Sequence, residues 1–254
     1  MKRILSVVLS IIMVLGLVAF VSCEKKPETL KFGLGVYTDV SKASNAEGEA
    51  NGQGKAAITV AAITVDANGK IVACELDTAD NTVAYTGEGK AIANDSFKTK
   101  YELGKDYNMV AYGGAVKEWY EQADAFEALI VGKTLAEVKA LVAEGDKGTD
   151  EVVNAGCTIM IGEFVGAIEK AYAAATTEIA ADAKIKVVVA TEQTCTDATE
   201  EKDGSNKVTM NVFASAMDAD GKLVAASSDC VEVSFTFTAA GASTLDTAKP
   251  VVSK

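Results

Sequence analysis

The chain has 254 residues, of which 49% are apolar and 6% aromatic, and its formal net charge is −12. This length accommodates two domains with real hydrophobic cores, and the negative charge disfavours binding to the phosphate backbone of nucleic acids. The chain contains no histidine, which removes the commonest general base, the histidine-activated nucleophiles and histidine-ligated metal sites. Any metal site would have to rely mainly on carboxylates and carbonyls, which favours calcium or magnesium over transition metals. No catalytic residue is nominated, and the composition favours a binding or structural protein over an enzyme.

The N-terminal segment has the pattern of an export signal. Two basic residues follow Met1, an uncharged apolar run covers residues 4–21, and Cys23 comes where that run stops. This pattern predicts a signal peptide at residues 1–22 and a polar tether at residues 23–29. An uncleaved membrane-spanning anchor is the alternative, because eighteen apolar residues can just cross a bilayer.

The end of the apolar run, Val21-Ser22-Cys23, resembles the lipobox of bacterial lipoproteins. The resemblance implies that Cys23 becomes the first residue of the mature chain and carries the lipid, with palmitate among the expected acyl groups. The remainder of the chain would then lie outside the cytoplasmic membrane, on its extracytoplasmic face. The membrane is thus an expected partner through the lipid anchor.

The chain contains an internal sequence repeat. Residues 55–77 and 207–229 share ten identical residues at a constant offset of 152, without a gap. Each copy is an extended apolar run, a D-A-[ND]-G-K turn and a second extended run, which is the pattern of a β-hairpin. The same turns resemble a calcium loop only faintly, because their glycine comes too early, so a plain hairpin turn is the better interpretation.

The remaining elements follow from periodicity and from turn residues. Helices are expected at 115–131, where Trp119, Ala123, Phe126 and Ile130 share one face, at 134–142 after a capping box, and from 162 to 175. Strands are expected at 30–40, 82–86, 157–161, 185–190 and 231–238, with polar loops at 41–54 and 197–204. Residues 185–190 would correspond to residues 33–38 in the repeat.

These elements predict an α+β fold built from two unequal modules. Residues 30–175 would form an antiparallel sheet covered by about three helices, residues 176–184 a linker, and residues 185–254 a β-only half-copy of the first module. A sheet without helical cover leaves an apolar face open. We therefore expect the second module to pack on the first one or on a partner.

Four cysteines follow Cys23, namely Cys74, Cys157, Cys195 and Cys230. An exported location permits disulfides, and Cys195 could pair with Cys230 if their strands were neighbours. Cys74 lies in an apolar strand, where a buried free thiol is expected. Catalysis by cysteine is not expected, because no histidine is present to activate a thiol.

An aromatic cluster precedes the first long helix and continues into it. Tyr101, Tyr107, Met109 and Trp119 gather there, with the pair Gly113-Gly114 between them. One interpretation is that these side chains are simply core. The other is a platform on which a planar ring can stack, with the glycine pair allowing the backbone and a helix N-terminus to approach the ligand.

Three segments resemble the FMN-binding domain of exported bacterial electron-transfer proteins and lipoproteins: VDANGKIV at 65–72, DEVVNAGCTI at 150–159 and FVGAIEKA at 164–171. The family motif is D-x-V-S-G-A-T-x-T-S. Gly156, Cys157 and Thr158 take the places of its glycine, alanine and first threonine, so the resemblance adds Thr158 to the candidate ligand-binding residues. Ala155 replaces the serine, and Met160 replaces the threonine that accepts flavin covalently in some members. The resemblance therefore implies non-covalent FMN.

The chain is also similar to uncharacterised surface lipoproteins with tandem copies of this module, which share a T-K-x-E-L-G-x-x-Y-x-M segment like residues 99–109. Two functions remain open. The first is a membrane-anchored lipoprotein that binds a small planar ligand, such as FMN, in its first module. The second is a cell-surface structural or interaction lipoprotein with a protein partner and without a small-molecule ligand.

Overall fold

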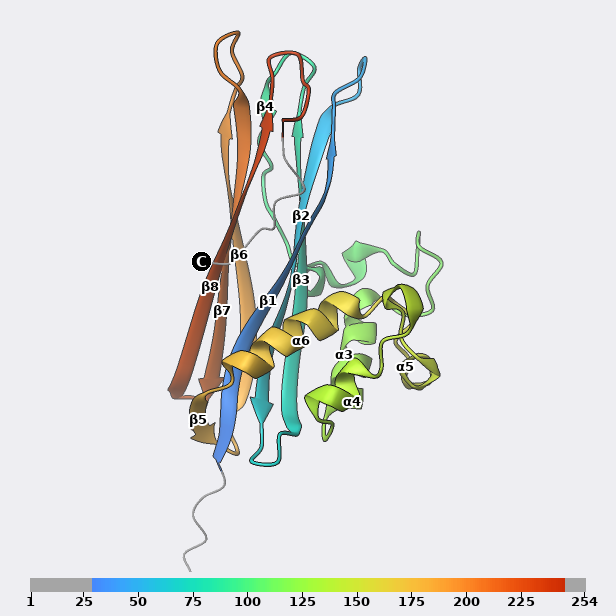
Figure 1. Ribbon diagram of the computed structural model, residues 1–254, viewed down its shortest axis with the longest axis vertical. Coiled ribbons are helices and arrows are strands. Elements are labelled where there is room, and N and C mark those ends of the chain that lie inside the picture. The colour runs from blue at the N-terminus through green and yellow to red at the C-terminus, as the bar shows by residue number, and fades with distance from the viewer. Residues whose placement is uncertain (1–28, 245–254) are drawn as a thin grey trace, which may run out of the picture.

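The computed structural model describes residues 29–244 and shows an α+β protein with two antiparallel sheets (Figure 1). A helical layer, a five-stranded sheet and a three-stranded sheet lie one behind another, and separate apolar cores fill the two spaces between them. The predicted signal peptide at 1–22 and the predicted lipidation site Cys23 lie outside the described residues.

The first sheet has the strand order β4-β3-β2-β1-β5. Its strands are β1 (Thr29–Ser44), β2 (Gly52–Val65), β3 (Ile71–Tyr85), β4 (Ala91–Ile92) and β5 (Thr177–Ala180).

Strand β2 is the middle strand of the first sheet and is covered on both faces. Every residue from Ala56 to Val65 is buried. Ile58 and Val60 face the second sheet, whereas Ala61 and Ile63 face the helices. A strand covered on both sides requires such a continuous apolar run rather than an alternating one.

The helical layer comes from the chain between β4 and β5. Its helices are α2 (Lys100–Leu103), η1 (Gly104–Tyr107), α3 (Trp119–Ile130), α4 (Leu135–Lys139), η2 (Glu144–Asp146), α5 (Asp150–Ala155) and α6 (Gly162–Ala174). The described residues therefore hold five α-helices rather than the expected three, because the short helices α2 and α5 carry too little periodicity to be recognised.

Helix α6 approaches β1 unusually closely because two glycines face it. A Cβ atom on Gly33 would lie 2.1 Å from the carbonyl oxygen of Ala171, and one on Gly35 would lie 2.2 Å from that of Ala167.

The predicted apolar face of α3 is confirmed, since Trp119 and the other three residues of that face are buried. The helix begins at Trp119 rather than at 115, because Glu118 and Glu121 form a capping box there.

The second sheet has the order β6-β7-β8, with β6 (Lys184–Thr196), β7 (Gly204–Met217) and β8 (Leu223–Phe237). Val231, Val233 and Phe235 alternate with more exposed residues along β8, as the pattern predicts, and point inward. They join one core with Val36 and Val60 of the first sheet, so the second sheet packs on the first, which is one of the two arrangements expected.

The two hairpin turns have the same structure. In each turn the aspartate N–H donates to the lysine carbonyl, at 2.9 Å for Asp66 and 3.0 Å for Asp218. Gly69 and Gly221 have φ values of 76° and 77°, a region that favours glycine. Both copies also shift their ladder register by one residue at the same place, between residues 64 and 65 and between 216 and 217.

Contacts between the sheets are reciprocal, as around an approximate two-fold axis. Ala46 N donates to Gly241 O at 2.8 Å, and Ala198 N donates to Gly89 O at 2.8 Å. Each donor and each acceptor in the first bond differs from its counterpart in the second by 152 residues. The rings of Tyr85 and Phe237, related by the same offset, stack with centroids 4.3 Å apart.

Two local expectations fail in the helical layer. Residues 157–161 form a loop rather than a strand, because Gly156 ends α5 in the left-handed region and Ile161 N bonds to the carbonyl of Asp146. The expected elements also leave residues 143–156 without a helix, but this segment contains α5, whose Val152 is buried.

Three further expectations about the second half need correction. The linker at 176–184 contains β5, which pairs with β1. Cys195 and Cys230 cannot meet, because β7 lies between the strands that carry them, and the four described cysteines are free thiols. Strand β1 has a bulge at residues 39–42, so Ile185 corresponds to Phe32, at an offset of 153 rather than 152.

Candidate functional site

A cavity of about 430 Å³ opens on the helical side of the first sheet. It lies between β3, the α2–η1 segment, the start of α3 and the loop that leads into α6. We call it the helix-side cavity, and it is lined by Thr78, Lys100, Tyr107, Met109, Trp119, Asp146, Thr158, Ile159, Met160, Gly162, Glu163 and Phe164.

Capping interactions fix the two segments that bring Lys100 and Met109 to this cavity. Thr99 caps α2 with Glu102, and Tyr101 N donates to the carboxylate of Asp77 at 3.3 Å, which ties α2 to β3. The Glu118 carboxylate accepts from Met109 N at 2.9 Å, so the cap of α3 also holds the loop that precedes it.

The aromatic walls are only partly available to a ligand. Trp119 is 3% exposed and makes edge contacts with the rings of Tyr101 and Phe164, at centroid distances of 5.6 and 5.7 Å. Trp119 is therefore a core residue that presents an edge to the cavity, while Tyr107 is less buried. The Lys100 ammonium lies 5.2 Å from the Tyr107 ring centroid and 5.5 Å from that of Trp119.

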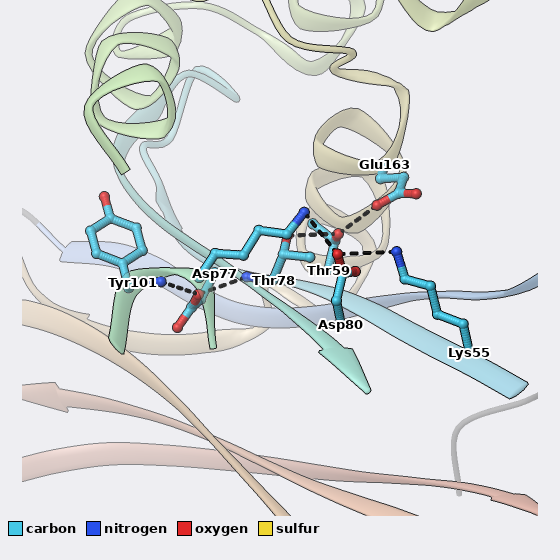
Figure 2. A network of polar contacts seen from close by, with 8 residues as sticks. Lys55, Thr59, Asp77, Thr78, Asp80, Tyr101 and Glu163 are labelled. Atoms are coloured by element: carbon cyan, nitrogen blue, oxygen red, sulfur yellow. Dashed lines mark hydrogen bonds and ion pairs between the residues drawn. The ribbon is translucent and has the colours of Figure 1, made fainter. Parts of the chain in front are cut away.

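A connected network of polar contacts includes the lining residues Thr78 and Glu163 of the cavity (Figure 2). Lys100 Nζ lies 3.4 Å from a carboxylate oxygen of Asp80, which also pairs with Lys55 at 3.0 Å. Next to it, the Thr59 hydroxyl lies 3.0 Å from that of Thr78 and 2.9 Å from Oε2 of Glu163. These bonds hold an ammonium group, a hydroxyl and a carboxylate on the wall of the cavity, beside its aromatic and apolar lining residues.

The mouth of the cavity includes the loop that follows α5. Thr158 donates to Oε1 of Gln122 through its N–H at 2.8 Å and its hydroxyl at 2.9 Å. Gln122 is 1% exposed and donates in turn to the carbonyl of Lys117 at 3.0 Å. The side chain of Met160 is 68% exposed, so a flexible thioether lies at the rim.

The predicted ligand-binding residues divide into two groups. Tyr107, Met109, Trp119 and Thr158 line the helix-side cavity. Tyr101 packs behind Trp119 and lines a neighbouring cavity. Gly113 and Gly114 belong to neither cavity; both are exposed and precede α3 by several residues, so they do not present a helix N-terminus to a ligand.

Sequence reasoning missed four of the polar lining residues, namely Thr78, Lys100, Asp146 and Glu163. Lys100 follows the recognisable cap residue Thr99 and could have been found from that signal. Thr78 and Glu163 carry no local signal, because only the strand register and the packing of α6 bring them together.

The neighbouring cavity, of about 220 Å³, lies at the edge of the sandwich between β3, α2 and β6. Asp77 lines it, and burial raises the pKa of this carboxyl to about 6. Glu127 of α3 accepts from Leu76 N at 2.6 Å, and burial raises its pKa to about 8, with Glu75 and Asp124 adding to the effect. These carboxyls hold α2 and α3 to the exposed edge of β3.

The two buried thiols of the first half are not activated. Burial raises the pKa of the Cys157 thiol to about 11 and that of the Cys74 thiol well above its ordinary value, so both stay protonated at neutral pH. Within residues 29–244, no three acidic, cysteine or histidine side chains are grouped closely enough to hold a metal ion. The described helices also include none that is long and apolar enough to span a membrane.

No family model, curated protein or solved structure gave a match to this chain.

Proposed function

We propose that this chain is a membrane-anchored extracytoplasmic lipoprotein that binds a small planar ligand of the flavin type, without a covalent bond, in the helix-side cavity. The observation that carries the proposal is a cavity of about 430 Å³ with aromatic walls and a few convergent polar groups. Small-molecule sites usually have this size and this composition. Its walls include four of the residues nominated from the sequence, among them Tyr107 and Thr158.

The side chains fit a ring that is held rather than bonded. Met160 offers no hydroxyl at the position of the family's covalent acceptor, and the Thr158 hydroxyl already donates to Gln122. A flavin supplies one- or two-electron transfer when it is bound. The chain would contribute Tyr107 and Phe164 as walls, Lys100 as a donor and Glu163 as an acceptor, with no residue acting as acid or base.

We also propose that the second sheet is a copy of the first module without its helices, and that the ligand site belongs to the first half alone. The matched turns, the shared bulges of the hairpins and the reciprocal contacts at an offset of 152 support this arrangement. Strand β1 begins at one end of the long axis, near the hairpin turns (Figure 1). A lipid on Cys23 would hold that end towards the membrane.

Trp119 is the only tryptophan of the chain, so tryptophan fluorescence reports on the cavity alone. We expect the purified full chain, in a mild non-ionic detergent, to retain a yellow chromophore after incubation with riboflavin or FMN and gel filtration. Quenching of Trp119 should accompany retention. Loss of all colour together with unchanged Trp119 emission would eliminate ligand binding of this kind.

Two tyrosines of one segment provide a matched pair of variants. Tyr107→Ala removes a wall of the cavity and should weaken ring binding about tenfold, since ring contacts contribute about 1 kcal/mol or more. Tyr112→Ala removes a side chain that is 88% exposed and should leave binding unchanged. Equal effects of the two substitutions would show that the ring binds elsewhere.

A structural or interaction role remains the second candidate, and one observation favours it. On the outer face of the second sheet, Val188 and Phe213 are neighbours across the β6–β7 pair and are 56% and 52% exposed. Such residues could contact another surface protein. Native mass spectrometry of the full chain would separate the two functions, because it reads bound small molecules and bound protein in one measurement.

A further inference from the structure

The polar groups of the helix-side cavity define the kind of ring edge that fits there. The Lys100 ammonium can only donate hydrogen bonds, the Glu163 carboxylate can only accept them, and the Thr78 hydroxyl can do both. A heterocycle with a carbonyl beside an N–H group presents the complementary set. A ligand without such an edge would leave a partly buried ammonium or carboxylate without its water, which costs binding free energy.

The position where an anion would ordinarily bind is already taken by the protein. Helix α6 begins at Gly162 on the cavity wall, and the N–H groups at a helix start attract phosphate. Here the Asp146 carboxyl group packs against that start, because a Cβ atom on Gly162 would lie 2.6 Å from its Cγ. Asp146 and Glu163 both line the helix-side cavity, so two carboxylates face the same space.

The balance of charge around the cavity is negative. Among the lining residues, Lys100 is the one ammonium and stands against the carboxylates of Asp146 and Glu163. Asp80 also pairs with Lys100 at 3.4 Å, which reduces the attraction of the ammonium for a ligand anion. A phosphate ester, which carries nearly two negative charges at neutral pH, would be repelled by these carboxylates.

We propose that the helix-side cavity binds an uncharged planar heterocycle by its amide edge, and that it discriminates against the phosphate ester of the same ring. This proposal rests on the proposed function, because it names the ligand class of the same site. It assigns specificity to Lys100 and Glu163 at the ring edge and to Asp146 against phosphate. Riboflavin is then a better ligand than FMN, although the two share one ring.

Three probes test the proposal on the full chain in non-ionic detergent, with Trp119 quenching and flavin fluorescence anisotropy as readouts. Riboflavin should bind about tenfold more tightly than FMN at low ionic strength, and added salt should narrow the difference. Riboflavin methylated at N3 lacks the N–H of the amide edge and should bind about tenfold more weakly than riboflavin.

Matched variants assign the discrimination to a residue. Asp146→Asn should strengthen FMN binding severalfold more than it changes riboflavin binding, so the ratio of the two affinities should shift towards FMN. Asp220→Asn removes the same charge from an exposed turn of the second sheet and should change neither affinity.

The outcomes separate the two proposals. If no flavin quenches Trp119, the proposed function fails and this inference fails with it. If riboflavin binds but FMN binds equally well or better, ring binding stands and the discrimination against phosphate is overturned. If the N3-methylated ring binds as tightly as riboflavin, recognition of the amide edge is overturned.

Discussion

The carboxyl group of Glu127 should make the stability of this protein fall as the pH rises. Burial raises its pKa from 4.5 to about 8 in the folded state, where it accepts a hydrogen bond from Leu76 N. Between these two values the folded chain holds a proton that the unfolded chain has lost. Unfolding then releases a proton, so the free energy of unfolding decreases as the pH rises through this window and stays level above it.

The range from pH 6 to pH 8 isolates this group. The chain has no histidine, and the pKa of Asp77, at about 6, lies at the lower limit of the range. Two pH units at 1.36 kcal/mol each give a loss of about 2 to 3 kcal/mol. Urea unfolding followed by Trp119 fluorescence at pH 6, 7 and 8 measures this loss directly.

Replacement of the carboxyl by an amide provides the control for Glu127. Glu127→Gln keeps an acceptor for Leu76 N and has no titrating proton, so its stability should be nearly constant from pH 6 to 8. Glu200→Gln, in an exposed loop of the second half, should keep the slope of the unaltered chain. A flat profile for the unaltered chain, or the same slope in Glu127→Gln, would refute the argument.

Two further predictions concern packing and the thiols. Gly35→Ala would place a Cβ atom 2.2 Å from the carbonyl oxygen of Ala167. It should lower the free energy of unfolding, measured by urea titration, by about 2 to 3 kcal/mol. Gly87→Ala is the control and should be nearly neutral, because the nearest atom to its Cβ would be 3.9 Å away. Mass spectrometry without reductant should find no Cys195–Cys230 disulfide, and iodoacetamide should modify exposed Cys195 well before the buried thiols; a bridged peptide would contradict the strand order.

The hairpins could be predicted from sequence because their determinants are local. Asp66 accepts from the N–H groups of Asn68 and Lys70, and Gly69 supplies the left-handed residue, all within one five-residue turn. The same holds for the caps at Thr99 and Thr134. Turns and helix caps can therefore be predicted from the sequence, because the residues that form their hydrogen bonds lie within a few positions of one another.

The loop at residues 157–161 shows where such reading stops. Its apolar and β-branched residues match a short strand, but Cys157 and Ile161 are buried as separate anchors and Met160 between them is exposed. The N–H of Ile161 finds its partner in Asp146, on a segment fifteen residues earlier. Tertiary hydrogen bonding therefore overrides a local preference for extended structure.

The candidate site was predictable in its aromatic part and unpredictable in its polar part. Tyr107 and Trp119 cluster in sequence, so they suggest a wall before any fold is known. Thr78 and Glu163 are 85 residues apart and share the cavity only because α6 crosses the sheet above β2, where Thr59 bonds to both side chains. Polar residues that meet only through packing, as these two do, show no periodic pattern in the sequence, so they could not be predicted from it.

The two sheets differ at the face where one of them carries helices. Ile63 and Leu76 lie under the helical layer, and their counterparts at the offset of 152 are Ser215 and Ser228 on the open face of the second sheet. Gly35, which admits α6, corresponds through the bulge in β1 to Val188, which is exposed. Exchange of apolar side chains for serines makes the uncovered face compatible with water. A cavity of the helix-side kind needs a second layer above the sheet, and within the described residues only the first half has one on its outer face.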